Sequence, residues 1–190
     1  GAVVRLAPIK DVKTMIYAFF ELHERLPQVR LHIMGGVDDE EYGAECHALV
    51  ETLGVRDLIF TGRVNVIEYM EKLDFTILTS ISEGQPLSVL ESLGARRPCV
   101  TTEVGCCREL LEGAPGDDFG VAGFVTPPMY RKGLADAMER MCASRARRIE
   151  MGERGQRRVA TYFLHEQMLA NYRALYDETA RAFGLPQKEV

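Results

Sequence analysis

A loop carboxylate, the start of a helix and a helical carboxylate follow one another between Ser82 and Glu91. Proline suits the first position of a helix because its missing N–H is not needed there, so Pro86 predicts a helix start. The free N–H groups of Leu87 and Ser88, backed by the positive end of the helix dipole, are then expected to form an anion site. Phosphate is the natural occupant of such a site.

Two glutamates flank this helix start. Glu91 lies four residues after Leu87, so it returns to the same helix face roughly 6 Å further along. A carboxylate there can accept hydrogen bonds from two vicinal ribose hydroxyls. Glu83 remains in the loop before the helix, on the other side of the phosphate, where it can face a sugar. The whole stretch therefore suits a phosphorylated sugar.

Positive charge comes from an earlier part of the chain. Arg5 and Lys10 lie at the end of an apolar strand candidate, residues 2–6, and before a helix that Asp11 opens. Arginine can bind two phosphate oxygens with its planar fork, and lysine acts as a compact point charge. Together they are expected to neutralise a diphosphate without a metal, so no metal ion and no cofactor is expected.

Composition limits the alternatives. A chain of 190 residues, 46% of them apolar, fits one domain with a core. The net charge of −5 argues against broad nucleic-acid binding. No apolar run approaches a membrane span and no signal region opens the chain, so a cytoplasmic location is expected.

Cysteine and histidine do not form an obvious site. The five cysteines are odd in number and lack zinc-like pairs, so reduced thiols are expected. The adjacent Cys106 and Cys107 could be a redox or metal site, but a turn near the ligand is the favoured interpretation. The four histidines are interpreted as structural or solvated.

Short apolar runs alternate with helical patterns and predict an α/β fold. The expected strands span residues 2–6, 30–34, 58–61, 75–78, 99–102 and 123–126. Strand, helix, strand repeats mean parallel pairing with right-handed crossovers, hence a Rossmann-like doubly wound sheet. Ligands bind outside the carboxyl ends of such strands, where Arg5, Gly35, Gly62, Ser80 and Gly105 all fall.

From Tyr130 onward the pattern is helical. We expect a Rossmann-like domain over residues 1–145, followed by C-terminal helices, residues 146–190, packed on it. A basic stretch in this part is expected to be a solvated helix face, with attraction to an anionic membrane as the alternative. It contains Arg145, Arg147, Arg148, Arg154, Arg157 and Arg158, interrupted by Glu150 and Glu153.

The chain resembles the donor half of a family 4 glycosyltransferase. The resemblance rests on Arg5 and Lys10, on Glu83 and Glu91, and on the blocks 60–64, 75–80, 97–102 and 123–128, which follow one another in the family's order. Residues 8–14 and 80–87 look closest to the PelF-type enzymes of exopolysaccharide synthesis. Val4 stands where the family usually has glycine.

The resemblance implies a GT-B enzyme whose C-terminal domain binds a nucleotide sugar, commonly a UDP-hexose. The acceptor domain is absent from this chain, so a glycan acceptor is expected to bind through a missing N-terminal domain. By resemblance, Glu91 binds ribose, Glu83 orients the hexose, and Arg63 and Val64 hold the base. The amides from Gly84 through Gln85, Pro86 and Leu87 to Ser88 are assigned to phosphate and sugar.

The implied reaction is retaining transfer without a protein nucleophile, in which Arg5 and Lys10 stabilise the departing diphosphate. A polysaccharide synthesis complex at the inner face of the membrane is the expected setting. Alternatives are a sugar-nucleotide epimerase of GT-B type, a degenerate donor domain and a flavodoxin-like signalling module. The module predicts an acidic cluster where Arg5 and Lys10 stand, and a dehydrogenase lacks the required GxGxxG.

Overall fold

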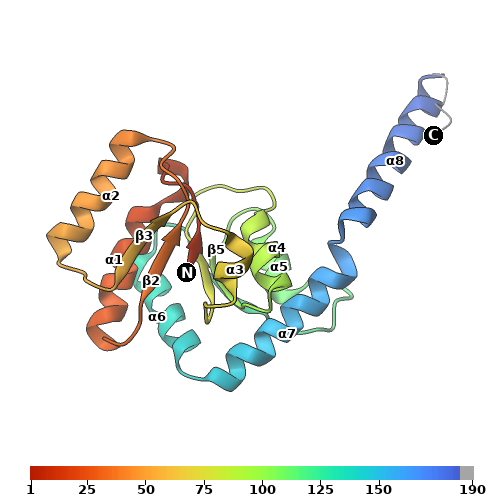
Figure 1. Cartoon of the computed structure of the whole chain (residues 1–190). Coiled ribbons are helices and arrows are strands. Elements are labelled where there is room, and N and C mark those ends of the chain that lie inside the picture. The colour runs from red at the N-terminus through yellow and green to blue at the C-terminus, as the bar shows by residue number, and fades with distance from the viewer. Residues whose placement is uncertain (185–190) are drawn as a thin grey trace.

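The chain folds into a parallel sheet with helices on both faces, followed by two long C-terminal helices (Figure 1). The computed structural model describes residues 1–184, and the predicted C-terminal segment 146–190 therefore extends beyond the described residues. The strands are β1 (Ala2–Val3), β2 (Leu31–Met34), β3 (Leu58–Gly62), β4 (Thr76–Leu78), β5 (Cys99–Thr102) and β6 (Gly123–Thr126).

The helices alternate with these strands. They are the short 3-10 helix η1 (Pro8–Lys10) and α1 (Val12–Arg25), α2 (Glu40–Leu53), α3 (Val66–Met70), α4 (Leu87–Gly94), α5 (Cys107–Glu112), α6 (Arg131–Cys142), α7 (Arg145–Tyr162) and α8 (His165–Ala182). Within residues 1–184, none of these helices combines the length and the apolar character that a membrane span requires.

The strands form two parallel ladders, β1-β2-β3 and β4-β5-β6. The ladders meet between β1 and β4, where the Ile77 N–H donates to the Gly1 carbonyl at 2.9 Å. The spatial order is therefore 3-2-1-4-5-6, the order of a Rossmann-type doubly wound sheet. The α/β class and the parallel sheet predicted from the sequence are confirmed.

Alternating strand residues separate the core into two layers. On one face, α1, α2 and α6 pack against residues such as Ile33, Ile77 and Val100. On the other face, α4 and α5 pack against Leu78 and Cys99, and α7 covers them. Both faces of the sheet are thus buried, as the continuous apolar character of the strands requires.

The strand boundaries agree with the sequence to within one residue, except at the first strand. β1 ends at Val3, not at Leu6, although the Val4 N–H still donates to the Met34 carbonyl at 2.8 Å. Leu6 then forms an isolated parallel bridge to Val37. The backbone leaves the ladder at Arg5, and this interruption frees the loop that carries Arg5 to Lys10.

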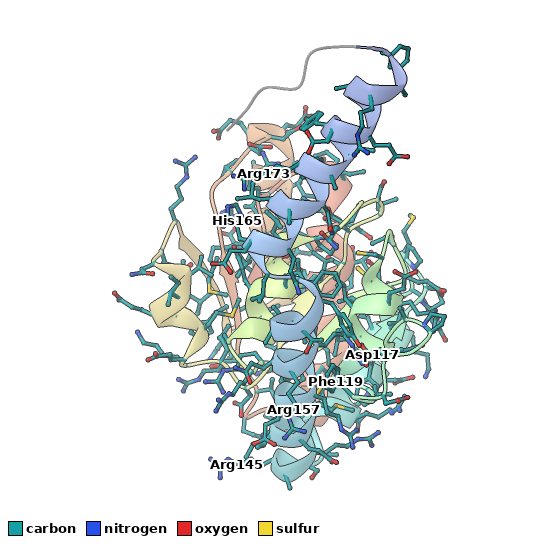
Figure 2. The ribbon with its side chains drawn as sticks, turned by 90° about the vertical axis from the view of Figure 1, so that its right-hand side faces the viewer. Asp117, Phe119, Arg145, Arg157, His165 and Arg173 are labelled. Carbon is teal, nitrogen blue, oxygen red and sulfur yellow. The ribbon has the colours of Figure 1, made fainter. Side chains whose placement is uncertain are left out.

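The basic stretch, which begins at Arg145, lies on α7 and was expected to be a solvated helix face, but one of its arginines is buried. Arg158 is buried, with 1% of its side chain exposed, and it forms an ion pair with Asp117. Its guanidinium also donates to the Leu110, Leu111 and Gly120 carbonyls at 2.7 to 3.2 Å. Figure 2 shows Asp117 beside α7, on the loop that follows α5.

Helix α8 behaves differently from α7. It buries no residue within its bounds and projects away from the sheet (Figure 1). The expectation that the C-terminal helices pack on the domain therefore fits α7 and does not fit α8. Large apolar side chains remain exposed along this part of the chain, and they include Met168, Tyr172, Leu175, Tyr176 and Phe183.

Candidate functional site

The loops after β1 and β4 meet at the carboxyl edge of the sheet. Lys10 Nζ lies 2.6 Å from Glu83 Oε1, and the two side chains are only 20% and 15% exposed. The Ser80 hydroxyl donates to the same carboxylate oxygen at 2.7 Å. Two sequence-predicted residues, 73 positions apart, are therefore brought into direct contact.

Backbone contacts hold this pair in place. The Thr79 hydroxyl donates to the Lys10 carbonyl at 2.9 Å, and the Ile81 N–H donates to the Ile9 carbonyl at 2.9 Å. Sequence reasoning missed Thr79 as a positioning residue. Its place just beyond a strand end was the signal that could have identified it.

The loop before α4 also rests on the turn after β5. The Cys106 N–H donates to the Gly84 carbonyl at 3.0 Å. Gly105 has a φ of 51°, and a Cβ at this position would lie 2.0 Å from the Gly84 oxygen. Only glycine fits here, because the two backbones touch and the conformation is left-handed.

The adjacent cysteines belong to this turn. Burial raises the pKa of the Cys106 thiol, and burial raises the pKa of Cys107 to about 11. Both thiols are therefore protonated near neutral pH, which disfavours a thiolate nucleophile. Within residues 1–184, no three His, Cys, Asp or Glu side chains cluster as a metal site would require.

Helix α4 starts one residue later than predicted. Pro86 is the N-cap, with extended backbone angles, and Leu87 is the first helical residue. The Pro86 carbonyl accepts from the Val89 N–H at 3.1 Å, whereas the N–H groups of Leu87 and Ser88 have no partner among residues 1–184. The pair of free amides expected from the sequence is thus present despite the shift.

Arg5 lies in the same edge region but has a different partner. Its guanidinium donates to Asp38 Oδ2 at 2.6 Å, and 63% of its side chain is exposed. Asp38 follows β2 and was not predicted, although it too lies just beyond a strand end. The structure therefore places Arg5 on the β2 side of the edge and Lys10 on the β4 side.

Val4, which stands where the family usually has glycine, fits its surroundings. Val4 is buried in the core and does not have a positive φ. The close approach occurs instead at Gly35, where a Cβ would lie 2.0 Å from the Val4 carbonyl oxygen. A β-branched residue therefore fits at Val4 because the facing residue is glycine.

The remaining predicted residues border the same edge. Arg63 is exposed after β3, and its side chain lies against Gly36, where a Cβ would be only 3.2 Å from Arg63 Nε. Val64 packs on the small cluster around Met34. Glu91 is exposed on α4 and, within residues 1–184, forms no ion pair. Together with Gln85 and Leu87 it lines an open cavity of about 670 Å³, and residues from the end of α7 and from α8 line the same cavity.

Comparisons with known proteins identify relatives of this fold. The sequence model of the family "Glycosyl transferases group 1" matches residues 1–144. N-acetyl-alpha-D-glucosaminyl L-malate synthase from Bacillus anthracis is 26% identical over 175 residues, which are 91% of this chain and 43% of that protein. The chain thus spans less than half the length of this relative.

Solved structures are similar over most of the chain. HepE from Anabaena, solved in complex with UDP and glucose, has a TM-score of 0.79 at 23% identity, covering 90% of this chain and 47% of HepE. The C-terminal domain of a group 1 glycosyl transferase from Francisella tularensis has a TM-score of 0.74 at 19% identity, covering 86% and 85%.

These likenesses establish the fold as the C-terminal half of a GT-B architecture with a helical extension. The family match covers well over half of the chain and includes both Lys10 and Glu83. The chain therefore belongs to the group 1 glycosyl transferase family.

Proposed function

We propose that this chain is the nucleotide-sugar-binding domain of a retaining glycosyltransferase. One observation carries the proposal: the Lys10–Glu83 pair forms in the loop that leads directly to the free amides of α4. A cation, a carboxylate and two N–H donors at one sheet edge match a diphosphate joined to a sugar. Family membership supports the same conclusion.

In this proposal the diphosphate competes with Glu83 for Lys10. The 2.6 Å contact of the Lys10 ammonium with Glu83, which lies in the loop before α4, supports this competition. The Leu87 and Ser88 amides then bind phosphate oxygens, and Arg5 adds charge from the exposed side. Positive charge at the departing diphosphate lowers the barrier because negative charge develops there.

The other residues position the donor. Glu83, once released from Lys10, accepts hydrogen bonds from the hexose hydroxyls. Glu91 binds the ribose, Arg63 and Val64 hold the base, and the backbone from Gly84 to Ser88 follows the phosphates. The acceptor hydroxyl attacks from the face that the diphosphate leaves, so no protein nucleophile and no metal is needed.

The wider setting is also a proposal. UDP is our proposed nucleotide, and it is the one bound in the similar HepE structure. We propose that the complete enzyme binds a glycan acceptor on an N-terminal domain and works in the cytoplasm, at the inner membrane face. The resemblance to PelF-type enzymes favours exopolysaccharide as the product.

Titration calorimetry of the 190-residue chain with UDP, GDP and ADP tests this proposal. We expect UDP to bind most tightly, and Glu91→Ala to weaken UDP about tenfold, because a charge-assisted hydrogen bond to ribose is lost. Glu153→Ala, at an exposed glutamate of α7, is the matched control and should bind like the parent. Absence of binding by all three nucleotides would contradict the donor role.

A further inference from the structure

A second group of cations lies at the opposite end of the strands from Lys10 and Glu83. It surrounds a hollow of about 210 Å³. The cations are Lys72, Arg96, Arg97, Arg145 and Arg148, and the acids beside them are Glu71 and Asp74. Asp74 precedes β4 and Arg97 precedes β5, so the hollow lies at the amino ends of the strands.

Two of these arginines are fixed by backbone carbonyls. Arg97 donates to the Met70 and Glu71 carbonyls at 2.9 and 3.0 Å. Arg148 donates to the Met141 and Cys142 carbonyls, both at 3.0 Å. Carbonyl groups are neutral, so they hold these guanidiniums at the hollow without cancelling their positive charge. Only Arg148 also approaches an acid, Asp74, at 3.2 Å.

The other two arginines are not held. Among residues 1–184, the guanidiniums of Arg96 and Arg145 make no hydrogen bond and no ion pair. Arg145 opens α7, and Figure 2 shows it at the end of that helix far from His165 and Arg173. The hollow therefore combines fixed positive charge with two arginine forks that have no partner.

Arg96 also has an unusual backbone. Its φ is 60°, in the left-handed region that favours glycine. Helix α7 presses on it, since a Cβ on Gly152 would lie 2.1 Å from the Arg96 carbonyl oxygen. A non-glycine residue kept at a strained backbone position indicates a use for its side chain.

We propose that this hollow binds a phosphate-bearing anion, with Arg96 and Arg145 as its direct ligands. Arginine forks match phosphate oxygens in geometry and charge. Arg97 and Arg148 attract the anion through positive charges that are held in place, and the negative charge of Asp74 opposes its binding. The phosphate belongs either to a free phosphorylated compound or to a phospholipid head group, and the site is independent of the donor site at the other sheet edge.

Titration of the isotope-labelled 190-residue chain with inorganic phosphate, followed by NMR, tests the proposal residue by residue. We expect the Arg96 and Arg145 backbone resonances to shift along one binding curve. Shifts confined to Leu87 and Ser88 would place phosphate only at the donor site and overturn the proposal.

Variants separate binding from folding. Arg96→Gly should weaken phosphate at this hollow about fivefold or more, yet raise the melting temperature because glycine suits the left-handed backbone. Arg145→Ala should weaken phosphate binding similarly, and Asp74→Asn should strengthen it. Arg157→Ala, at an exposed arginine of α7, is the control and should leave phosphate binding unchanged. Parental affinity in the Arg96→Gly, Arg145→Ala double variant overturns the proposal.

Co-sedimentation with vesicles identifies the source of the phosphate. Binding to phosphatidylglycerol vesicles but not to phosphatidylcholine vesicles, lost in the double variant, assigns a lipid head group. Phosphate binding at Arg96 and Arg145 without vesicle binding assigns a free phosphorylated compound. Binding of neither probe at these residues refutes the anion site.

Discussion

At the scale of single residues, Lys10 and Glu83 form an ion pair. Their side chains are mostly buried, so their attraction is screened less than that of an exposed pair. Ser80 still donates to Glu83 when Lys10 turns away, so the carboxylate keeps one fixed hydrogen bond. An exchange of partners, with Lys10 moving to a diphosphate, therefore leaves Glu83 with a hydrogen-bond donor and with a charge that is free to accept hydrogen bonds from the sugar.

Replacement of Lys10 separates this role from folding. Lys10→Ala should weaken UDP binding about tenfold, because a charge-assisted contact to phosphate is lost. Because the pair is mostly buried, the variant should also lower the free energy of unfolding, by roughly 1–3 kcal/mol. Lys13→Ala removes a similar but more exposed pair, to Glu45, and is the control. Equal UDP affinity for the Lys10→Ala variant and the parent would rule out the phosphate contact.

Gly105 gives a second prediction at this scale. Gly105→Ala places a Cβ against the Gly84 carbonyl in a left-handed conformation, so the loop before α4 must shift. We expect weaker UDP binding and roughly 1–3 kcal/mol lower stability in urea unfolding. Gly94→Ala meets no atom within 4 Å and should be neutral or stabilising. Unchanged UDP binding in the Gly105→Ala variant would show that the loop position is unimportant.

At the scale of elements, α7 is fastened to the sheet domain by Arg158. This one side chain joins Asp117 to the carbonyls at the end of α5, while the start of α5 supports the loop before α4. Arg158→Met leaves a buried carboxylate without its partner and should cost about 3–5 kcal/mol in urea unfolding. Arg157→Met, next to it and exposed, should change stability by less than about 0.5 kcal/mol. Equal stability of the two variants would contradict the anchoring role.

The same pair predicts a pH dependence. The Arg158 guanidinium lowers the pKa of Asp117, so the folded state favours the charged carboxylate. This contribution is complete above the unfolded pKa of about 4 and is lost as the pH falls toward the folded pKa. Asp117→Asn should therefore flatten the loss of stability below about pH 4. Parallel acid unfolding curves for the two proteins would show that the pair contributes nothing.

The sequence predicted the elements well because local patterns determine them. The strands 99–102 and 123–126 are reproduced at both ends, since buried β-branched runs bounded by turns have few alternatives. Lys10 was predicted from its place after the first strand, and Glu83 from its place in the loop before a helix start, together with the family resemblance. Asp38 and the burial of Arg158 were missed, because each depends on a partner distant in sequence, which periodicity does not reveal.

At the scale of the whole molecule, α8 is the element with the least support. It buries no residue and extends from the domain (Figure 1). Hydrogen exchange should therefore be fast throughout residues 165–182 and slow in α1 and α6, which are packed in the main core. Mass spectrometry of exchanged peptides measures this difference. Protection of α8 equal to that of α6 would mean that another surface covers it.

The central claim is that one sheet edge, built from Lys10, Glu83 and the start of α4, binds the diphosphate of a nucleotide sugar. An NMR titration of the 190-residue chain with UDP tests it most directly. We expect large, saturable shifts of the Leu87 and Ser88 amides and of Lys10. Shifts that spare α4 and Lys10, or no saturable shifts at all, would contradict it.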